Sequence, residues 1–170
     1  MPHKETAEWR CLFEAANLEN DRWMKRAGPI DRGGRMSNIT GGCHCGAIRY
    51  QVEGEPIVHA LCHCTDCRRH AGAPMVGWTM YPEDAVKVTK GQPKVYESSE
   101  HGRRQFCADC GTGLFYTNAN VLPGLIDIQS GTYDDPDAVP AVVHIQVAER
   151  LRWMEGAHQL PSFERYPPQP

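Results

Sequence analysis

The chain has 170 residues and a formal net charge of -3, so its length favours one domain and its charge gives no basic field for nucleic acid or an anionic membrane. No run of 18 apolar residues occurs, which excludes a membrane-spanning helix. The first residues lack an apolar signal region, and we therefore expect a cytoplasmic protein whose thiols stay reduced.

Residues 1–35 differ in composition from the rest of the chain. A weak helical pattern of apolar residues covers the first part, and residues 28–35 have the glycine and proline content of a linker. We expect an N-terminal extension over residues 1–35, helical or disordered, followed by one folded domain over residues 36–170.

From residue 39 onward the pattern predicts short β-strands separated by turn residues. Apolar and polar residues alternate, or short apolar runs occur, at 47–52, 57–61, 75–81, 85–88, 94–96, 104–106, 113–117, 125–129 and 142–147. Residues 65–71 are expected to form one or two helical turns. The spacing of the strands indicates a mainly β domain.

Seven of the eight cysteines fall into three motifs with short spacers. The motifs are C-x-C at 43–45, C-x-C-x-x-C at 62–67 and C-x-x-C at 107–110. Thiols this close in sequence cannot all form unstrained disulfides within their own motifs, but they can chelate zinc. Metal binding is therefore the first interpretation.

One complete set of four zinc ligands is Cys43, Cys45, Cys107 and Cys110. Its two halves lie far apart in the chain, so a closed site would join the start of the sheet to its later half and contribute folding free energy directly. Gly46 and Gly111 each follow a cysteine and suit the tight turns that bring backbone amides to sulfur.

The remaining cysteines, Cys62, Cys64 and Cys67, supply only three ligands. A zinc ion with three protein ligands and an exchangeable fourth position is the usual catalytic arrangement. The alternative is a second structural site completed by a histidine, with His63, His70 and His101 as candidates. A different partition of the seven cysteines is also compatible with the sequence.

These motifs resemble the glutathione-dependent formaldehyde-activating enzyme family, which includes vertebrate centromere protein V. The resemblance is carried by residues 42–50, 62–69 and 106–112, and more weakly by 130–136, 144–145 and 160–163. It implies a β-tent fold of short antiparallel strands pinned by zinc. It also implies two zinc ions per chain, a structural one on Cys43, Cys45, Cys107 and Cys110 and a catalytic one on Cys62, Cys64 and Cys67.

The family's reaction joins glutathione and formaldehyde into S-(hydroxymethyl)glutathione and is classed as a carbon–sulfur lyase reaction. By resemblance we expect a small thiol to occupy the fourth zinc position and attack an aldehyde, with a proton from His63, His70 or Asp66. Arg68, Arg69 and His63 are the candidates for substrate binding. The two arginines would hold the carboxylates of the thiol substrate or offset the negative charge of the zinc cluster, or are structural. The alternative function is a non-catalytic zinc-binding interaction module. The oligomeric state is not predicted.

Other residues are expected to serve packing. Trp78, Trp153, Phe115 and Tyr116 are interpreted as core or sheet-face residues, and His144 as a core histidine on an apolar strand. The basic pair Arg103 and Arg104 is too isolated, in an acidic chain, to indicate nucleic-acid binding.

Overall fold

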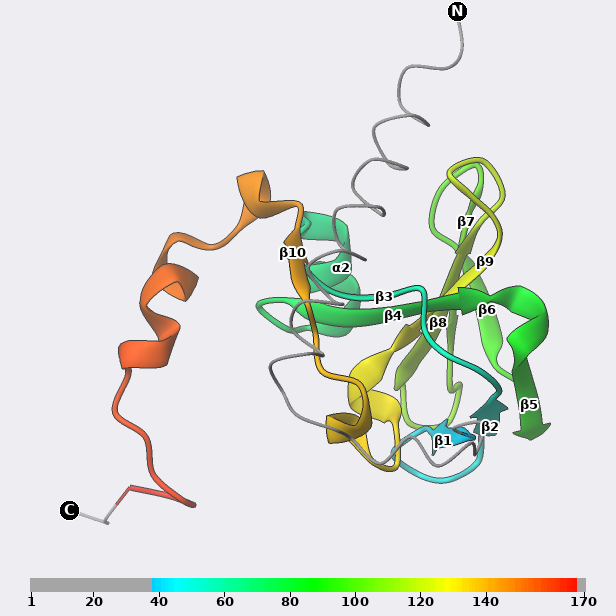
Figure 1. Cartoon of the computed structure of the whole chain (residues 1–170), viewed down its shortest axis with the longest axis horizontal. Helices are drawn as coiled ribbons and strands as arrows, with labels where there is room; N and C mark the ends of the chain where they lie inside the picture. Colours follow the sequence, from blue (N-terminus) through cyan, green and yellow to red (C-terminus); the bar gives the residue numbers. More distant parts are fainter. Residues whose placement is uncertain (1–37, 168–170) are drawn as a thin grey trace, which may run out of the picture.

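The computed structural model describes residues 38–167, and this part of the chain is mainly β, as predicted (Figure 1). The smaller of its two sheets has the strand order β1 (Ile39–Gly42), β2 (Arg49–Val52) and β5 (Val86–Lys90). The larger has the order β10 (Val143–Ile145), β3 (Val58–Cys62), β4 (Val76–Pro82), β9 (Leu122–Gln129), β8 (Gly113–Asn118), β7 (Gly102–Phe106) and β6 (Lys94–Glu97). The extension expected over residues 1–35 lies outside the described residues.

Every strand that the sequence pattern predicted overlaps an observed strand. The expected helical turns are present as α2 (Thr65–Ala71), which ends at Gly72 in the left-handed conformation that glycine adopts without strain. Short 3-10 helices connect the strands at η1 (Glu83–Ala85), η2 (Ser130–Thr132) and η3 (Pro136–Ala138).

The pairing of β10 departs from the antiparallel expectation. This strand runs parallel to β3, whereas the other strand pairs are antiparallel. The chain leaves β9 and reaches β10 only after the connection 130–142, and a connection of this length lets it return in the same direction as β3.

The main core lies between the two sheets. Tyr50 and Val52 of the smaller sheet pack with residues such as Tyr81, Phe115 and Ile128 of the larger one, and all five are almost fully buried. The rings of Tyr50 and Phe115 meet edge-on with centroids 5.1 Å apart. The packing expected for Phe115 is thereby confirmed.

A second, smaller core lies where α2 meets the larger sheet. It consists of Cys62, Cys67, Val76 and Trp78, with Tyr116 packed against them. Figure 1 shows α2 beside β3 and β4. The packing expected for Trp78 and Tyr116 is thus found in this core, next to two cysteines.

The segment after β10 leaves the sheets and contains η4 (Val147–Glu149) and η5 (Arg152–Gln159), drawn in orange and red in Figure 1. Trp153 is 58% exposed, so the expectation that it packs in the core is wrong. The reason is that η5 lies outside both cores, and an aromatic residue in the sequence does not show which segments the sheets cover. Within residues 38–167, none of the helices is long and apolar enough to cross a membrane.

Candidate functional site

Two turns far apart in the chain bring four cysteines together. Cys43 and Cys45 follow β1, Cys107 and Cys110 connect β7 to β8, and their four sulfur atoms all lie within 4.8 Å of one another. The Sγ atoms of Cys43 and Cys45 are 3.5 Å apart, and those of Cys45 and Cys107 are 3.8 Å apart. We call this group the four-cysteine cluster.

Backbone amides shape the four-cysteine cluster. The amide of Gly46 donates to the carbonyl of Cys43 and that of Gly111 to the carbonyl of Cys107, and both glycines have positive φ, near 75°. The amide of Ile48 donates directly to Cys43 Sγ at 3.2 Å. Four converging sulfurs with amide donors turned toward them match the requirements of a closed tetrahedral zinc site.

The second group, the three-cysteine cluster, forms where β3 passes into α2. Cys62 ends β3, Cys64 is the N-cap of α2 and Cys67 lies in its first turn, with the three sulfurs within 4.8 Å of one another. Cys64 Sγ accepts a hydrogen bond from the amide of Cys67 at 3.3 Å. Cys62 and Cys67 are buried, whereas Cys64 is partly exposed.

No fourth metal-binding side chain joins the three-cysteine cluster among residues 38–167. The histidines proposed above as a fourth ligand, His63, His70 and His101, are therefore outside it. These donors are soft sulfurs, which select zinc over hard cations, and three protein ligands leave one tetrahedral position for a substrate. The donor set fits zinc and offers one ligand fewer than a closed structural site.

The environment of Cys67 favours a thiolate. The indole Nε1 of Trp78 donates to Cys67 Sγ at 3.3 Å, and the guanidinium nitrogens of Arg104 lie 3.8 and 3.9 Å from the same sulfur. Indole and guanidinium groups are donors only, so the sulfur must accept. Hydrogen bonds from Cys62, Cys64 and Trp78, in that order, and the charge of Arg104 lower the pKa of Cys67.

His63 points away from the three-cysteine cluster. Its neighbours Cys62 and Cys64 share the opposite side of the extended backbone, and His63 Nε2 lies 2.9 Å from His144 Nδ1 on β10. His63 is buried, but His144 is exposed, so the expectation of a core histidine at position 144 is wrong. The reason is that β10 lies at the edge of the larger sheet, where His144 is open to solvent.

The two arginines that follow the cluster differ in their surroundings. Arg68 is partly buried and donates to the carbonyl of His63, to Thr65 Oγ1 and to the carbonyl of Glu149. Arg69 is exposed. The contacts of Arg68 favour the structural alternative, and a substrate-binding role for either arginine remains a prediction.

A carboxyl group on the α2 side of the sheet was not found by sequence reasoning. Asp127 interrupts the apolar strand β9 and occupies the same cross-strand row as Met80 and Tyr116. Burial, and then the charge of Cys67, raise the pKa of Asp127 to about 7. A charged residue within the apolar run 125–128 was the available signal.

The Asp127→Asn variant is expected to be stabilised more at pH 8 than at pH 6. The raised pKa means that the folded protein binds this proton more tightly than the unfolded chain, so Asp127 increasingly destabilises the fold as pH rises from about 4 to about 7, and the effect is fully present above that. The gain in free energy of unfolding should be about 1 kcal/mol larger at pH 8, measured by urea denaturation. Asp137→Asn, at an exposed position, is the control. Equal gains at both pH values would contradict the assignment.

The fold and the two clusters define a mainly β protein with two cysteine sites able to hold metal. The family model described as glutathione-dependent formaldehyde-activating enzyme matches residues 38–149. The chain belongs to this family, as the sequence motifs had indicated.

Two curated relatives match this chain, one over most of its length and the other over half of it. A Halomonas elongata protein named as a candidate glutathione-dependent formaldehyde-activating enzyme is 26% identical over 140 residues, which cover 76% of this chain and 88% of that protein. An uncharacterized lyase of Schizosaccharomyces pombe is 31% identical over 85 residues, covering 50% of this chain and 61% of that protein. These relatives support a lyase.

A Rhodobacter sphaeroides protein of known crystal structure shares the fold. The TM-score is 0.51 with 20% sequence identity, over 62% of this chain and 98% of that one. At this identity the likeness concerns the fold alone.

Proposed function

We propose that the protein is a zinc-dependent carbon–sulfur lyase that adds a small thiol, glutathione or a similar one, to formaldehyde or another small aldehyde. The observation that carries the proposal is the three-cysteine cluster, in which Cys62, Cys64 and Cys67 converge without a fourth metal-binding side chain among the described residues. The thiol and the aldehyde are inferred from the family description and from the names of the relatives.

In this proposal two zinc ions are held per chain. Cys43, Cys45, Cys107 and Cys110 hold a structural ion, and Cys62, Cys64 and Cys67 hold the catalytic one. When bound at the three-cysteine cluster, zinc would keep a substrate thiol in its thiolate form at neutral pH. The reducing cytoplasm, where the cluster thiols remain free, is the compartment we infer.

The addition itself needs a nucleophile and a proton. The substrate thiol releases its proton to the solvent and its sulfur forms a bond to the aldehyde carbon. The π electrons of the carbonyl move to its oxygen, and that oxygen takes up one proton, so that no net proton is gained or lost. The product is a hemithioacetal, which is an S-hydroxymethyl thioether when the aldehyde is formaldehyde, and the reverse reaction returns the thiol and the aldehyde.

His70 is the proton donor that the geometry favours among His63, His70 and Asp66. It follows Cys67 by three residues on α2 and therefore lies on the same side of the helix. Burial, and then the charge of Arg104, lower the pKa of His70, whereas the charge of Cys67 acts in the opposite direction. Asp66 is exposed, and His63 is turned toward His144.

The alternative is an interaction module that holds both metal ions without catalysis. The two functions differ in how the three-cysteine cluster responds to a thiol. An enzyme exposes one coordination position to its substrate, whereas a structural site is closed.

The test is the zinc content of the reconstituted full-length protein, with and without glutathione, followed by a screen of thiol and aldehyde pairs. We expect two zinc ions per chain. We also expect glutathione to change the visible absorption of the cobalt-substituted protein, and at least one thiol and aldehyde pair to turn over. Two tightly held metal ions that do not respond to any thiol would favour the interaction module.

A further inference from the structure

Arg104 is a buried cation without a carboxylate partner in the described part of the chain. It lies on β7 and is 6% exposed, and none of the ion pairs of residues 38–167 includes it. Its guanidinium carbon lies 4.9 Å from the centre of the Tyr116 ring, and its two terminal nitrogens face Cys67 Sγ. A buried charge is costly unless an opposite charge accompanies it.

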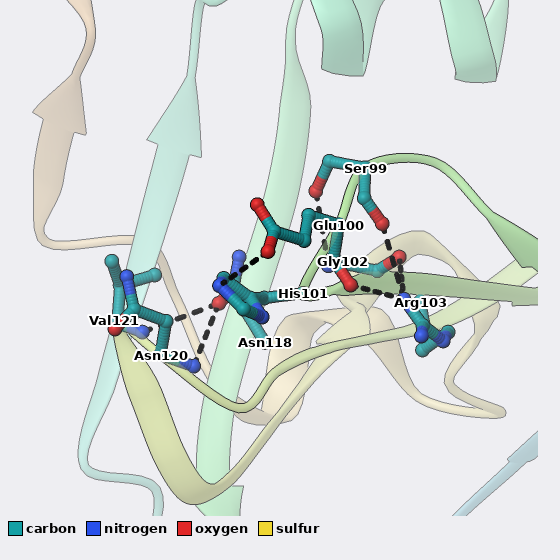
Figure 2. A network of polar contacts seen from close by, with 8 residues as sticks. All are labelled: Ser99, Glu100, His101, Gly102, Arg103, Asn118, Asn120 and Val121. Carbon is teal, nitrogen blue, oxygen red and sulfur yellow. Dashed lines mark hydrogen bonds and ion pairs between the residues drawn. The ribbon is translucent and has the colours of Figure 1, made fainter.

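The preceding residue, Arg103, lies on the other face of the same strand, where its charge and its hydrogen-bond donors have partners. Arg103 pairs with Glu97 at 3.5 Å and donates to the carbonyls of Ser99, Glu100 and Gly102. Figure 2 shows Arg103 with its three backbone acceptors, and none of the residues drawn there is a cysteine. Successive side chains of a strand point to opposite faces, so β7 directs one arginine to this surface loop and the other to the three-cysteine cluster.

The anion that Arg104 requires is available in the three-cysteine cluster. Three thiolates on a divalent cation leave a net charge of about -1. Cys67 Sγ already accepts a hydrogen bond from Trp78 Nε1, and the guanidinium group of Arg104 places a full positive charge beside the same sulfur. The Tyr116 ring holds the guanidinium in place through a cation–π contact.

We propose that Arg104 is a positioning residue, the fixed counter-ion of the three-cysteine metal centre. It fixes Cys67 as a metal ligand and offsets the surplus negative charge of the centre. An incoming substrate thiolate then joins a site that is close to neutral rather than one that repels it. The inference rests on the proposed function in one respect, namely that Cys62, Cys64 and Cys67 hold zinc.

The test compares metal retention in the reconstituted full-length protein and in three variants. Arg104→Met removes the charge and keeps a long apolar side chain, Arg104→Lys keeps the charge, and Arg103→Met is the matched control on the opposite face. Zinc release is followed with a chromogenic chelator, and the cobalt-substituted proteins report thiolate coordination by absorption. The four-cysteine cluster serves in every sample as an internal measure of folding.

We expect Arg104→Met to lose metal from the three-cysteine centre about 10- to 100-fold more readily than the unchanged protein, as is typical when a partner of a metal ligand is removed. Arg104→Lys should stay within about threefold of the unchanged protein, because a charge remains. Arg103→Met should not differ. In all variants the four-cysteine cluster should retain its metal.

Three results would overturn the inference. Unchanged retention in Arg104→Met refutes it, and so does an equal loss in Arg104→Met and Arg104→Lys, which would make the shape of the side chain decisive rather than its charge. Weakening of both clusters to the same extent would show a general effect on folding. If the unchanged protein holds metal only at the four-cysteine cluster, the proposed function fails together with this inference, and that outcome is distinguishable before any variant is made.

Discussion

The Cys107→Ser variant is expected to lose the metal of the four-cysteine cluster and much of its folded population. Cys107 is 1% exposed and lies in the turn between β7 and β8, whereas Cys43 and Cys45 lie in the turn between β1 and β2. A metal held by these turns connects the smaller sheet to the larger one. Because such a site does not exist in the unfolded chain, its binding free energy stabilises the fold directly.

We expect the free energy of unfolding to fall by at least about 3 kcal/mol, a large share of the stability of a typical domain. The measurement is urea denaturation followed by circular dichroism, together with the zinc content. Cys107→Ala separates two explanations, because alanine removes the ligand without burying a hydroxyl group. If Cys107→Ala kept the stability of the unchanged protein, the metal would not be what stabilises this region.

The sequence was sufficient to predict both cysteine groups because their geometry is mostly local. C-x-C in extended backbone and C-x-x-C in a turn place two sulfurs together, whatever the rest of the chain does. Only the joining of 43–45 with 107–110 needed a long-range assumption, and the structure brings these four sulfurs together. The strands were predictable for the same local reason.

Long-range contacts decided what the sequence could not show. Arg103 and Arg104 are identical neighbours, and only the pairing of β7 with β8, which sets Arg104 opposite Tyr116, reveals which of them faces the cluster. His144 has an apolar sequence context but lies on an edge strand, where it contacts His63. Trp153 has no sheet above it, and hydrophobicity alone could not indicate that.

Cys64→Ser is expected to abolish activity while leaving the fold nearly intact. Serine is among the preferred N-cap residues, so its hydroxyl can accept the hydrogen bond that Cys64 Sγ receives from the amide of Cys67. The helix start is thereby kept, but a hydroxyl does not replace a thiolate as a zinc ligand. Because Cys64 is partly exposed, the substitution leaves no buried polar group.

Turnover of the thiol and aldehyde pair should fall by about a hundredfold or more in Cys64→Ser, with one zinc ion per chain retained. The free energy of unfolding should fall only by the contribution of the lost zinc ion, because the helix cap is kept. Cys64→Ala should lose the same activity and also the helix cap, so it should be less stable than Cys64→Ser by roughly 1 kcal/mol. Stopped assays of product, zinc content and urea denaturation on the three proteins give these quantities. A Cys64→Ser protein that kept both zinc ions and full turnover would show that Cys64 is not a required zinc ligand and would contradict the proposed role of the three-cysteine cluster in the reaction.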